Sequence, residues 1–388
     1  MSNAALPFGL PDPAAGPVDL LIVAGEHSGD EHAARVVREL RARHPGLRIC
    51  ALGGPELAAA GAQLLHDLTA TSVVGFIEVL KHYSFFKALF DATLRWVAQH
   101  QPRAVCFVDY PGFNLRLAAK LREQGLSRKG GGKIQALYYI SPQIWAWKPK
   151  RRFTMARDLD ALAVIFPFEP DCYKDTSLPV EFVGHPFIAP DYVPPVRYDP
   201  AGPVLLLPGS RVQAVGRIFP VLLAGFRQFG AREAIVLYPS QDILAALRAA
   251  NPPANVRLQQ IAEGRAVSGA IAASAVLTSS GTMSLHCALA GIPGAIAYRT
   301  NALTYLLARW WVKIDYIGIA NLLLKEPMYP EFIQGAATAP ALAAQLRECT
   351  GDPGRRTKTQ ARQVRLRALL AQTAHGTAAD WLAARLVR

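Results

Sequence analysis

Apolar runs of strand length alternate with amphipathic segments of helix length along the chain. Residues 18–24 form one apolar run, and a helical pattern follows over residues 30–43. Residues 104–108 and then residues 115–124 repeat this order. Apolar strands that alternate with helices are typical of parallel sheets covered by helices on both faces. The pattern therefore predicts an α/β fold built from Rossmann-like units.

The alternation continues in the second half, after a stretch that breaks it. Residues 185–203 hold six prolines, which disfavour regular structure because proline fixes φ and lacks an N–H donor. A chain of 388 residues also exceeds the size of one typical domain. We predict a disordered N-terminal extension over residues 1–17, a first domain over 18–190, a linker over 191–203, a second domain over 204–365, and a C-terminal helix over 366–388 that packs back on the first domain or on a partner.

Composition supports a folded chain with anionic partners. Hydrophobic residues make up 51% of the chain and charged residues 18%, so disorder is excluded for most of it. The net charge of +13 favours nucleic acid, anionic lipid headgroups or phosphorylated small molecules, although solvated basic faces are the alternative. Five scattered cysteines without a CxxC pair, and no signal peptide, indicate a reducing compartment, and we expect the cytoplasm.

Two loops in the first half follow strands and carry polar side chains. Ligands of doubly wound sheets collect at the carboxyl ends of the strands. The loop at residues 24–30 has two glycines that let a backbone approach a ligand, and Ser28 or Asp30 can cap the next helix. Asp109 directly follows residues 104–108, where a carboxylate can accept a proton from a substrate hydroxyl. The structural alternative is that both loops are tight turns and that Asp109 only ties one down.

Two loops in the second half have the composition of an anion site. Residues 207–211 and 279–282 each lie between a strand and a helix and combine glycine with hydroxyl groups. A free helix N-terminus binds anions, and Arg211 adds a bidentate donor for a diphosphate. No P-loop sequence occurs, so a diphosphate that is held but not hydrolysed favours a nucleotide sugar. The histidines and acidic residues lack convincing metal spacing, and we predict no metal site.

Residues 73–90 are apolar almost all round, with Lys81 and Lys87 among the few charges. Such a helix is usually part of a core, but with basic residues and aromatics it can lie in a membrane interface. The predicted lipid-contact residues are Val74, Phe76, Ile77, Leu80, Phe85, Phe86 and Leu89.

Nine short motifs occur in an order and at spacings that are highly specific together. They are AGEHSGD at Ala24, VGFIEVL at Val74, VDYPGFN at Val108, YYISPQIWAWKPKR at Tyr138, PFEP at Pro167, FVGHP at Phe182, LPGSR at Leu207, SSGT at Ser279 and YIGIANLL at Tyr316. Over residues 20–334 the chain thereby resembles the lipid-A-disaccharide synthases. The resemblance implies a GT-B fold, in which two Rossmann-like domains face a central cleft, and neither metal ion nor cofactor.

The resemblance also implies a reaction and its partners. A UDP-linked diacylglucosamine would donate its sugar, with inversion, to diacylglucosamine 1-phosphate, giving a β-1,6-linked disaccharide and UDP. Asp109 matches the base that activates the acceptor 6-hydroxyl. The residues that match the donor site are Arg211, Ser210, Ser280, Gly281, Thr282, His286 and Asn321 in the second domain, and Gly25, Glu26, Ser28 and Asp30 in the first. The resemblance implies that the protein lies peripherally on the inner face of the cytoplasmic membrane and binds no nucleic acid. Whether it forms a homodimer stays open.

The chain departs from the family pattern at three positions. Relatives usually have acidic residues where this chain has Gly112, Ala214 and His286. A neutral histidine can hydrogen-bond a ribose hydroxyl but lacks the charge of a carboxylate. A divergent paralogue that uses another UDP-sugar or lipid acceptor, a non-catalytic nucleotide-sugar or lipid-binding protein and a UDP-sugar epimerase therefore remain alternatives.

Overall fold

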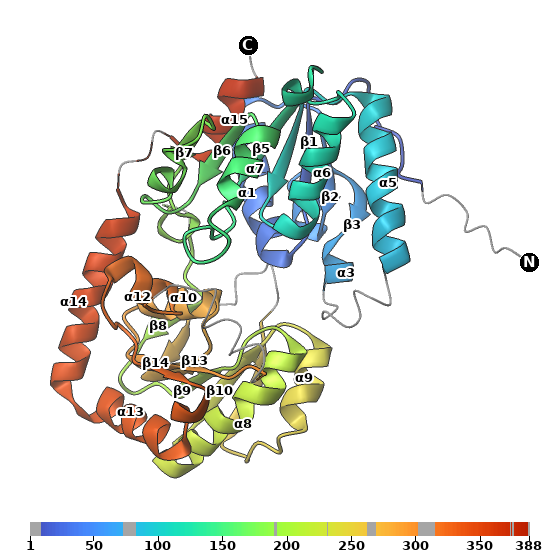
Figure 1. Ribbon diagram of the computed structural model, residues 1–388. Coiled ribbons are helices and arrows are strands. Elements are labelled where there is room, and N and C mark those ends of the chain that lie inside the picture. Colours follow the sequence, from blue (N-terminus) through green and yellow to red (C-terminus); the bar gives the residue numbers. More distant parts are fainter. Residues whose placement is uncertain are drawn as a thin grey trace, which may run out of the picture. The chain divides into compact units, whose positions relative to one another are not determined.

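The computed structural model describes residues 9–72, 83–189, 192–230, 232–261, 269–301, 315–372, 374 and 376–386. The chain divides into two compact units (Figure 1). The first runs to Pro186 and includes the residues from Gln372 onward, and the second runs from Phe187 to Ala371.

The first unit contains a parallel sheet with the strand order β3-β2-β1-β4-β5-β6-β7 among its described residues. Chain order runs outward from β1 to β3 and then continues from β4 on the other side of β1. The sheet is thus doubly wound, and its switch point lies between β1 and β4. The strands are β1 (Leu20–Ala24), β2 (Ile49–Gly53), β3 (Gln63–Asp67), β4 (Ala104–Val108), β5 (Gln135–Tyr139), β6 (Ala161–Val164) and β7 (Val180–Phe182).

Amphipathic helices cover this sheet. Helix α1 (His27–Arg43) buries Ala33, Val37 and Leu40 against it, while Arg41 and Arg43 in its last turn suit the negative end of the helix dipole. The apolar strands and the buried helix faces form one core. The other α-helices that the structure describes in this unit are α2 (Pro55–Ala59), α3 (Thr69–Ser72), α5 (Tyr83–His100), α6 (Pro111–Glu123), α7 (Arg151–Asp158) and α15 (Ala378–Leu386).

The second unit repeats the plan with the strand order β11-β10-β9-β13-β14-β15, again parallel. Its switch point lies between β9 and β13. The strands are β9 (Val204–Leu207), β10 (Ala234–Tyr238), β11 (Val256–Gln260), β13 (Ala275–Thr278), β14 (Gly294–Tyr298) and β15 (Glu331–Ile333), and a separate pair joins β8 (Val196–Tyr198) to β12 (Ile271–Ala273). The α-helices among the described residues of this unit are α8 (Val212–Phe229), α9 (Gln241–Arg248), α10 (Thr282–Leu289), α12 (Ile319–Leu324), α13 (Ala339–Gly351) and α14 (Pro353–Leu370). The predicted parallel α/β organisation is confirmed in both units.

Two predicted segments differ from the structure. The expected linker includes strand β8, which forms because Val196 is fully buried and its strand pairs with β12. The expected disordered extension is ordered in its described part. There the Trp96 indole N–H donates to the Pro11 carbonyl. The side-chain amide of Gln63 donates to the Asp12 carbonyl and accepts the Ala14 N–H. These partners come from distant segments of the chain, so local composition could not reveal them.

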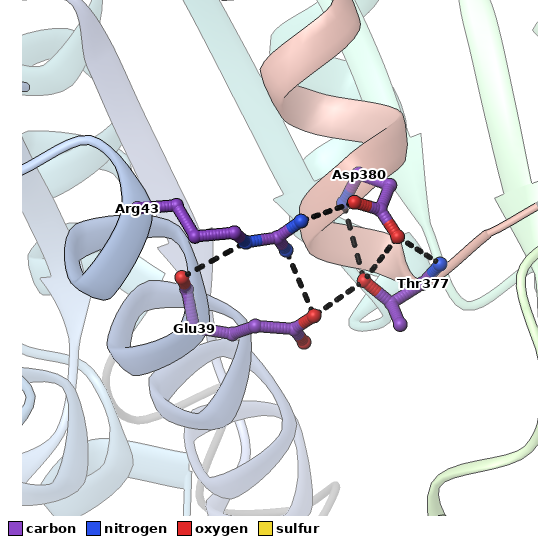
Figure 2. Close-up of polar contacts among 4 residues, drawn as sticks. All are labelled: Glu39, Arg43, Thr377 and Asp380. Atoms are coloured by element: carbon purple, nitrogen blue, oxygen red, sulfur yellow. Dashed lines mark hydrogen bonds and ion pairs between the residues drawn. The ribbon is translucent and has the colours of Figure 1, made fainter.

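The C-terminal helix α15 packs on α1 within the first unit. Figure 2 shows the polar contacts at this junction: Arg43 pairs with Asp380, and the Thr377 hydroxyl donates to Glu39 at 2.7 Å. These groups are largely exposed and contribute little individually. Burial of Trp381 and Leu382 beside them gives the helix most of its attachment.

Candidate active site

The switch point of the first sheet brings two predicted loops together. Strands β1 and β4 are paired up to Ala24 and Val108, so the residues that follow each strand emerge side by side. Gly25 and Glu26 follow β1, and Asp109 follows β4. Ligands of doubly wound sheets bind at this place. The structure therefore groups three predicted site residues at the expected edge of the sheet.

Asp109 sits on a strained turn that its neighbours hold in place. Asp109 and Tyr110 have φ values of 45° and 49°, a region that costs energy for residues other than glycine. The Asp109 carbonyl accepts hydrogen bonds from the Tyr138 hydroxyl at 2.6 Å and the Asn114 amide at 2.8 Å, and its N–H donates to Tyr139 at 3.0 Å. This clamp fixes where the carboxylate can point.

The environment of Asp109 makes its carboxylate unusually basic. Burial raises the pKa of Asp109 from 3.8 to about 6, and the nearby negative charge of Glu26 adds to the rise. At neutral pH the group is still mostly ionised, yet it binds a proton more tightly than an ordinary aspartate. A general base works best when its pKa lies close to the pH at which the enzyme operates.

Gly25 allows the ring of Tyr110 to lie against the first loop. A Cβ atom added at Gly25 would stand 2.1 Å from Tyr110 Cδ1, so the ring would have to move. Because Tyr110 adjoins Asp109, we expect Gly25→Ala to lower kcat about 10- to 100-fold by misplacing the carboxylate. Gly112→Ala is the matched control, since a Cβ there meets no atom within 4 Å. Equal kcat values for the two variants in steady-state assays would contradict this positioning role.

Asp30 occupies a different place from the one predicted. Its carboxylate is buried and accepts the backbone N–H groups of Gly54 at 2.8 Å, Glu56 at 3.0 Å and Leu57 at 3.3 Å. Burial raises the pKa of Asp30, although these bonds oppose the rise. The side chain thus joins α1 to the loop after β2 and is not presented to a ligand. Ser28, in the first turn of α1, is half-buried.

The predicted lipid-contact segment is only partly described. Val74, Phe76, Ile77 and Leu80 lie outside the described residues. Phe85 and Phe86 are half-buried, and Phe85 packs against the core. Leu89 is fully buried in that core, so its assignment to a lipid-contact surface is wrong. An apolar residue on an amphipathic helix belongs to the core more often than to the surface, and Leu89 of α5 is such a core residue.

The switch point of the second sheet brings together the other two predicted loops. Strands β9 and β13 are paired up to Leu207 and Thr278. Residues 208–211 lead into α8, and residues 279–281 lead into α10. Gly209 has a φ of 113°, and a Cβ there would come within 3.3 Å of Ser279 Oγ, so the two loops are in close contact. Glycine suits this position on both grounds.

The first turns of α8 and α10 have the features of an anion site. Among the described residues, no side chain caps the helix at Arg211 or at Gly281, and neither first turn contains an acidic residue. Uncapped N–H groups and the positive end of the helix dipole attract anions. Ser210, Arg211 and Thr282 are exposed, and Ser280 is half-buried. A diphosphate fits this combination of backbone and side-chain donors.

His286, one turn along α10 from Thr282, belongs to an aromatic stack. Its ring lies 4.0 Å from that of Phe187 between centroids, and its Nδ1 shares a hydrogen bond with the Tyr192 hydroxyl. Tyr192 also stacks on Phe187 at 5.4 Å. A hydrogen bond from His286 to a ribose would therefore use Nε2 or require the bond to Tyr192 to break.

Asn321 is fully buried, and the protein uses its polar atoms. Its amide donates to the Tyr329 carbonyl at 2.7 Å and to Glu331 at 2.8 Å, and its oxygen accepts the Tyr329 N–H at 2.9 Å. Glu331 also accepts the N–H groups of Ile317 at 2.9 Å and Gly318 at 2.9 Å. Asn321 thus positions the loop before α12. Glu331 was not predicted, since its sequence signal is a lone acidic residue in a short apolar run.

Asp158 and Asp160, which are separated by one leucine in the sequence, both have structural partners. Asp158 is paired with Arg122 at 2.7 Å and Arg157 at 2.8 Å, and Asp160 accepts the Ala136 N–H at 2.7 Å. Over the described ranges, no group of three metal-ligating side chains comes together. No helix in the same ranges is long and apolar enough to cross a membrane.

Comparison with known proteins decides the family. The profile of the lipid-A-disaccharide synthetase family matches residues 20–384. The chain belongs to this family. Its curated relatives include the lipid-A-disaccharide synthases of Geobacter sulfurreducens, 35% identical over 88% of this chain and 90% of the relative, and of Nitrosococcus oceani, 34% identical over 94% and 95%. The family resemblance of the motifs is thereby confirmed.

Solved structures of more distant proteins share the fold. The glycosyltransferase of kitacinnamycin has a TM-score of 0.57 at 16% identity, with 95% of this chain and 99% of that chain covered. UDP-GlcNAc 2-epimerase from Neisseria meningitidis has a TM-score of 0.56 at 12% identity, with 90% and 99% covered. Likeness at this level of identity concerns the fold alone. It confirms the predicted GT-B fold class.

Proposed function

We propose that this family member transfers 2,3-diacylglucosamine from its UDP derivative to 2,3-diacylglucosamine 1-phosphate. Membership of the family makes the chain a UDP-sugar-dependent glycosyltransferase of lipid A disaccharide formation. The clamped, basic Asp109 at the switch point of the first sheet is the observation that carries the mechanism. Because both substrates are acylated, we further propose that the protein works peripherally at the inner face of the cytoplasmic membrane.

Asp109 is the base in this mechanism. Its carboxylate takes the proton of the acceptor 6-hydroxyl as the oxygen attacks the anomeric carbon of the donor sugar. The new carbon–oxygen bond forms while the bond from the anomeric carbon to the phosphate oxygen breaks, and the electron pair leaves with UDP. Attack opposite to the leaving group inverts the anomeric centre. The clamp on the Asp109 backbone keeps the carboxylate oriented without reorganisation during the reaction.

The second unit holds the leaving group. The first-turn N–H groups of α8 and α10, with Arg211 and Ser280, offset the negative charge that grows on the diphosphate as it departs. Arg211 is exposed and unshielded by an acidic side chain in its own helix turn, so it can donate to two phosphate oxygens.

The activity test offers both acylated substrates to the purified protein and measures UDP and disaccharide. We expect the two products in equal amounts, and no loss of donor when the acceptor is left out. Interconversion of the donor sugar without acceptor would instead support the epimerase alternative. Binding of UDP without turnover would support a non-catalytic protein.

The pKa of Asp109 predicts a pH profile. Since the base must be ionised and its pKa is about 6, kcat/KM should rise tenfold per pH unit well below that value and level off above it. We expect kcat/KM to be about tenfold lower at pH 5 than at pH 7. Initial rates at subsaturating substrate over this range check the prediction. A flat profile would contradict the assignment of Asp109 as the titrating base.

A further inference from the structure

Three exposed aromatic side chains of the first unit occur within one stretch of the sequence, residues 147–168, which is separate from the predicted lipid-contact residues 74–89. Trp147 is 49% exposed, Phe153 48% and Phe168 36%. Among the described residues, these are the only tryptophan, tyrosine or phenylalanine side chains in the exposed class. The other large apolar residues exposed to this degree are single valines. The grouping therefore requires an explanation beyond ordinary surface composition.

The same region is strongly basic. Residues 143–157 contain five lysine and arginine side chains and no acidic one. Lys148 and Lys150 are exposed, and Arg151 is half-buried. Arg152 bonds the two carboxylate oxygens of Asp175 at 2.7 and 2.6 Å, and Arg157 pairs with Asp158 at 2.8 Å. Positive charge and aromatic rings thus share one surface.

The local structure keeps these rings at the surface. Ile144 and Met155, on either side, are buried in the core and anchor the segment. Between them, Lys148 Nζ lies 4.2 Å from the centre of the Trp147 ring, and the Arg152 guanidinium lies 4.4 Å from that of Phe153. The ion pair with Asp175 fixes Arg152 and therefore its place beside Phe153. Cation and ring form adjacent pairs, in which the ring can enter an apolar layer while the cation stays at its polar edge.

Phe168, the third exposed aromatic residue, packs against two other aromatic rings. Trp145 contacts Phe168 at 5.5 Å between centroids, and Phe166 stacks on Phe168 at 5.8 Å. Trp145 is only two residues from Trp147. Phe168 is thus joined to the segment that carries Trp147 through its contact with Trp145.

We propose that Trp147, Phe153 and Phe168, with Lys148, Lys150 and Arg151, form a docking surface for an anionic lipid bilayer. Aromatic rings insert at the level of the headgroups, and lysine and arginine are attracted to anionic headgroups. The inference rests on the proposed function in one respect, because acylated substrates place the enzyme's work at such a surface. It names the side chains that make the contact, which family membership does not.

The test measures sedimentation of the full-length protein with vesicles of phosphatidylcholine alone and of phosphatidylcholine with phosphatidylglycerol. We expect binding to the anionic vesicles that weakens with salt. Lys148→Gln with Lys150→Gln should weaken it about 30-fold, since each basic residue near an anionic surface contributes about fivefold. Trp147→Ser with Phe153→Ser should weaken it at least tenfold at low and high salt alike. All four side chains are exposed, so the variants should keep the melting temperature of the parent.

Matched variants on α14 control for general loss of charge or apolar surface. Arg356→Gln with Lys358→Gln removes two charges from the basic helix α14, and Val364→Ser removes a valine that is 64% exposed. These should bind the anionic vesicles like the parent protein. Equal losses in docking and control variants, or full binding by the docking variants, would overturn the proposal. So would docking variants that lose affinity for a single-stranded RNA while keeping that for vesicles.

The two proposals can fail separately. UDP release from substrates dispersed in detergent, where no bilayer is offered, should be the same in the docking variants and the parent. Parent protein that binds anionic vesicles through these residues but releases no UDP would refute the proposed function alone. Parent protein that releases UDP while its vesicle binding ignores these residues would refute the docking surface alone.

Discussion

Asp109→Asn is expected to reduce kcat about 10²- to 10⁴-fold, the range that a positioned general base contributes. Asparagine keeps the size of the side chain but cannot take the proton of the acceptor hydroxyl. The backbone clamp from Tyr138 and Asn114 acts on the Asp109 carbonyl, which the substitution leaves in place. Binding of UDP should therefore stay unchanged. Single-turnover assays with saturating donor, and calorimetric titration with UDP, measure the two quantities.

The same variant should be more stable than the parent at neutral pH. The pKa of Asp109 is raised from 3.8 to about 6 by folding, so ionisation of this group opposes the folded state. The cost is absent below pH 3.8, grows as pH rises between the two values and is complete above about 6. A shift of this size corresponds to at most ~3 kcal/mol. Chemical denaturation at pH 7.5 should show the gain, and at pH 4 the gain should nearly vanish.

A control separates the loss of the base from unrelated effects. Asp171→Asn replaces an exposed aspartate of the same unit, and we expect it to leave both kcat and stability unchanged. Loss of activity together with a gain in stability would be hard to explain by damage to the fold, because damage lowers both. Normal turnover by Asp109→Asn would mean that another group takes the proton.

The sequence predicts the strand ends well because their signals are local. An apolar run followed by glycine and a polar residue indicates where a buried strand ends, and in a doubly wound sheet that place is the ligand side. Gly25, Asp109 and Arg211 were all proposed as site residues in this way. Which strands become neighbours is not a local property, and the strand orders with their two switch points come from the structure.

Side-chain roles that depend on distant partners could not be predicted in the same way. Asp30 was expected at the ligand, but its acceptors are filled by the N–H groups of Gly54, Glu56 and Leu57. Leu89 looked like lipid-facing surface, and the core buries it. Glu331 carried no visible signal, since its importance arises only when β15 is set beside residues 317–318. In each case the decisive contact joins segments that are not adjacent in the sequence.

Asn321→Ala is expected to destabilise the second unit by about 2–4 kcal/mol. The change removes three hydrogen bonds and leaves the backbone N–H and carbonyl of buried Tyr329 without these partners. It also frees Glu331, which holds the N–H groups of Ile317 and Gly318 ahead of α12. We therefore expect the KM for the donor to rise together with the loss of stability. Chemical denaturation of the full-length protein and donor-dependent rates give the two measurements.

Glu331→Gln distinguishes a positioning role of Asn321 from direct contact with the donor. The glutamine weakens the bonds to Ile317, Gly318 and Asn321 because it replaces a charged acceptor by a neutral one. If Asn321 acts by holding this loop, Glu331→Gln should raise the donor KM in the same direction, and the double variant should lose less stability than the sum of the single losses. If Asn321 instead touches the donor, Asn321→Ala should raise the donor KM strongly, whereas Glu331→Gln should lower stability but leave the donor KM near that of the parent.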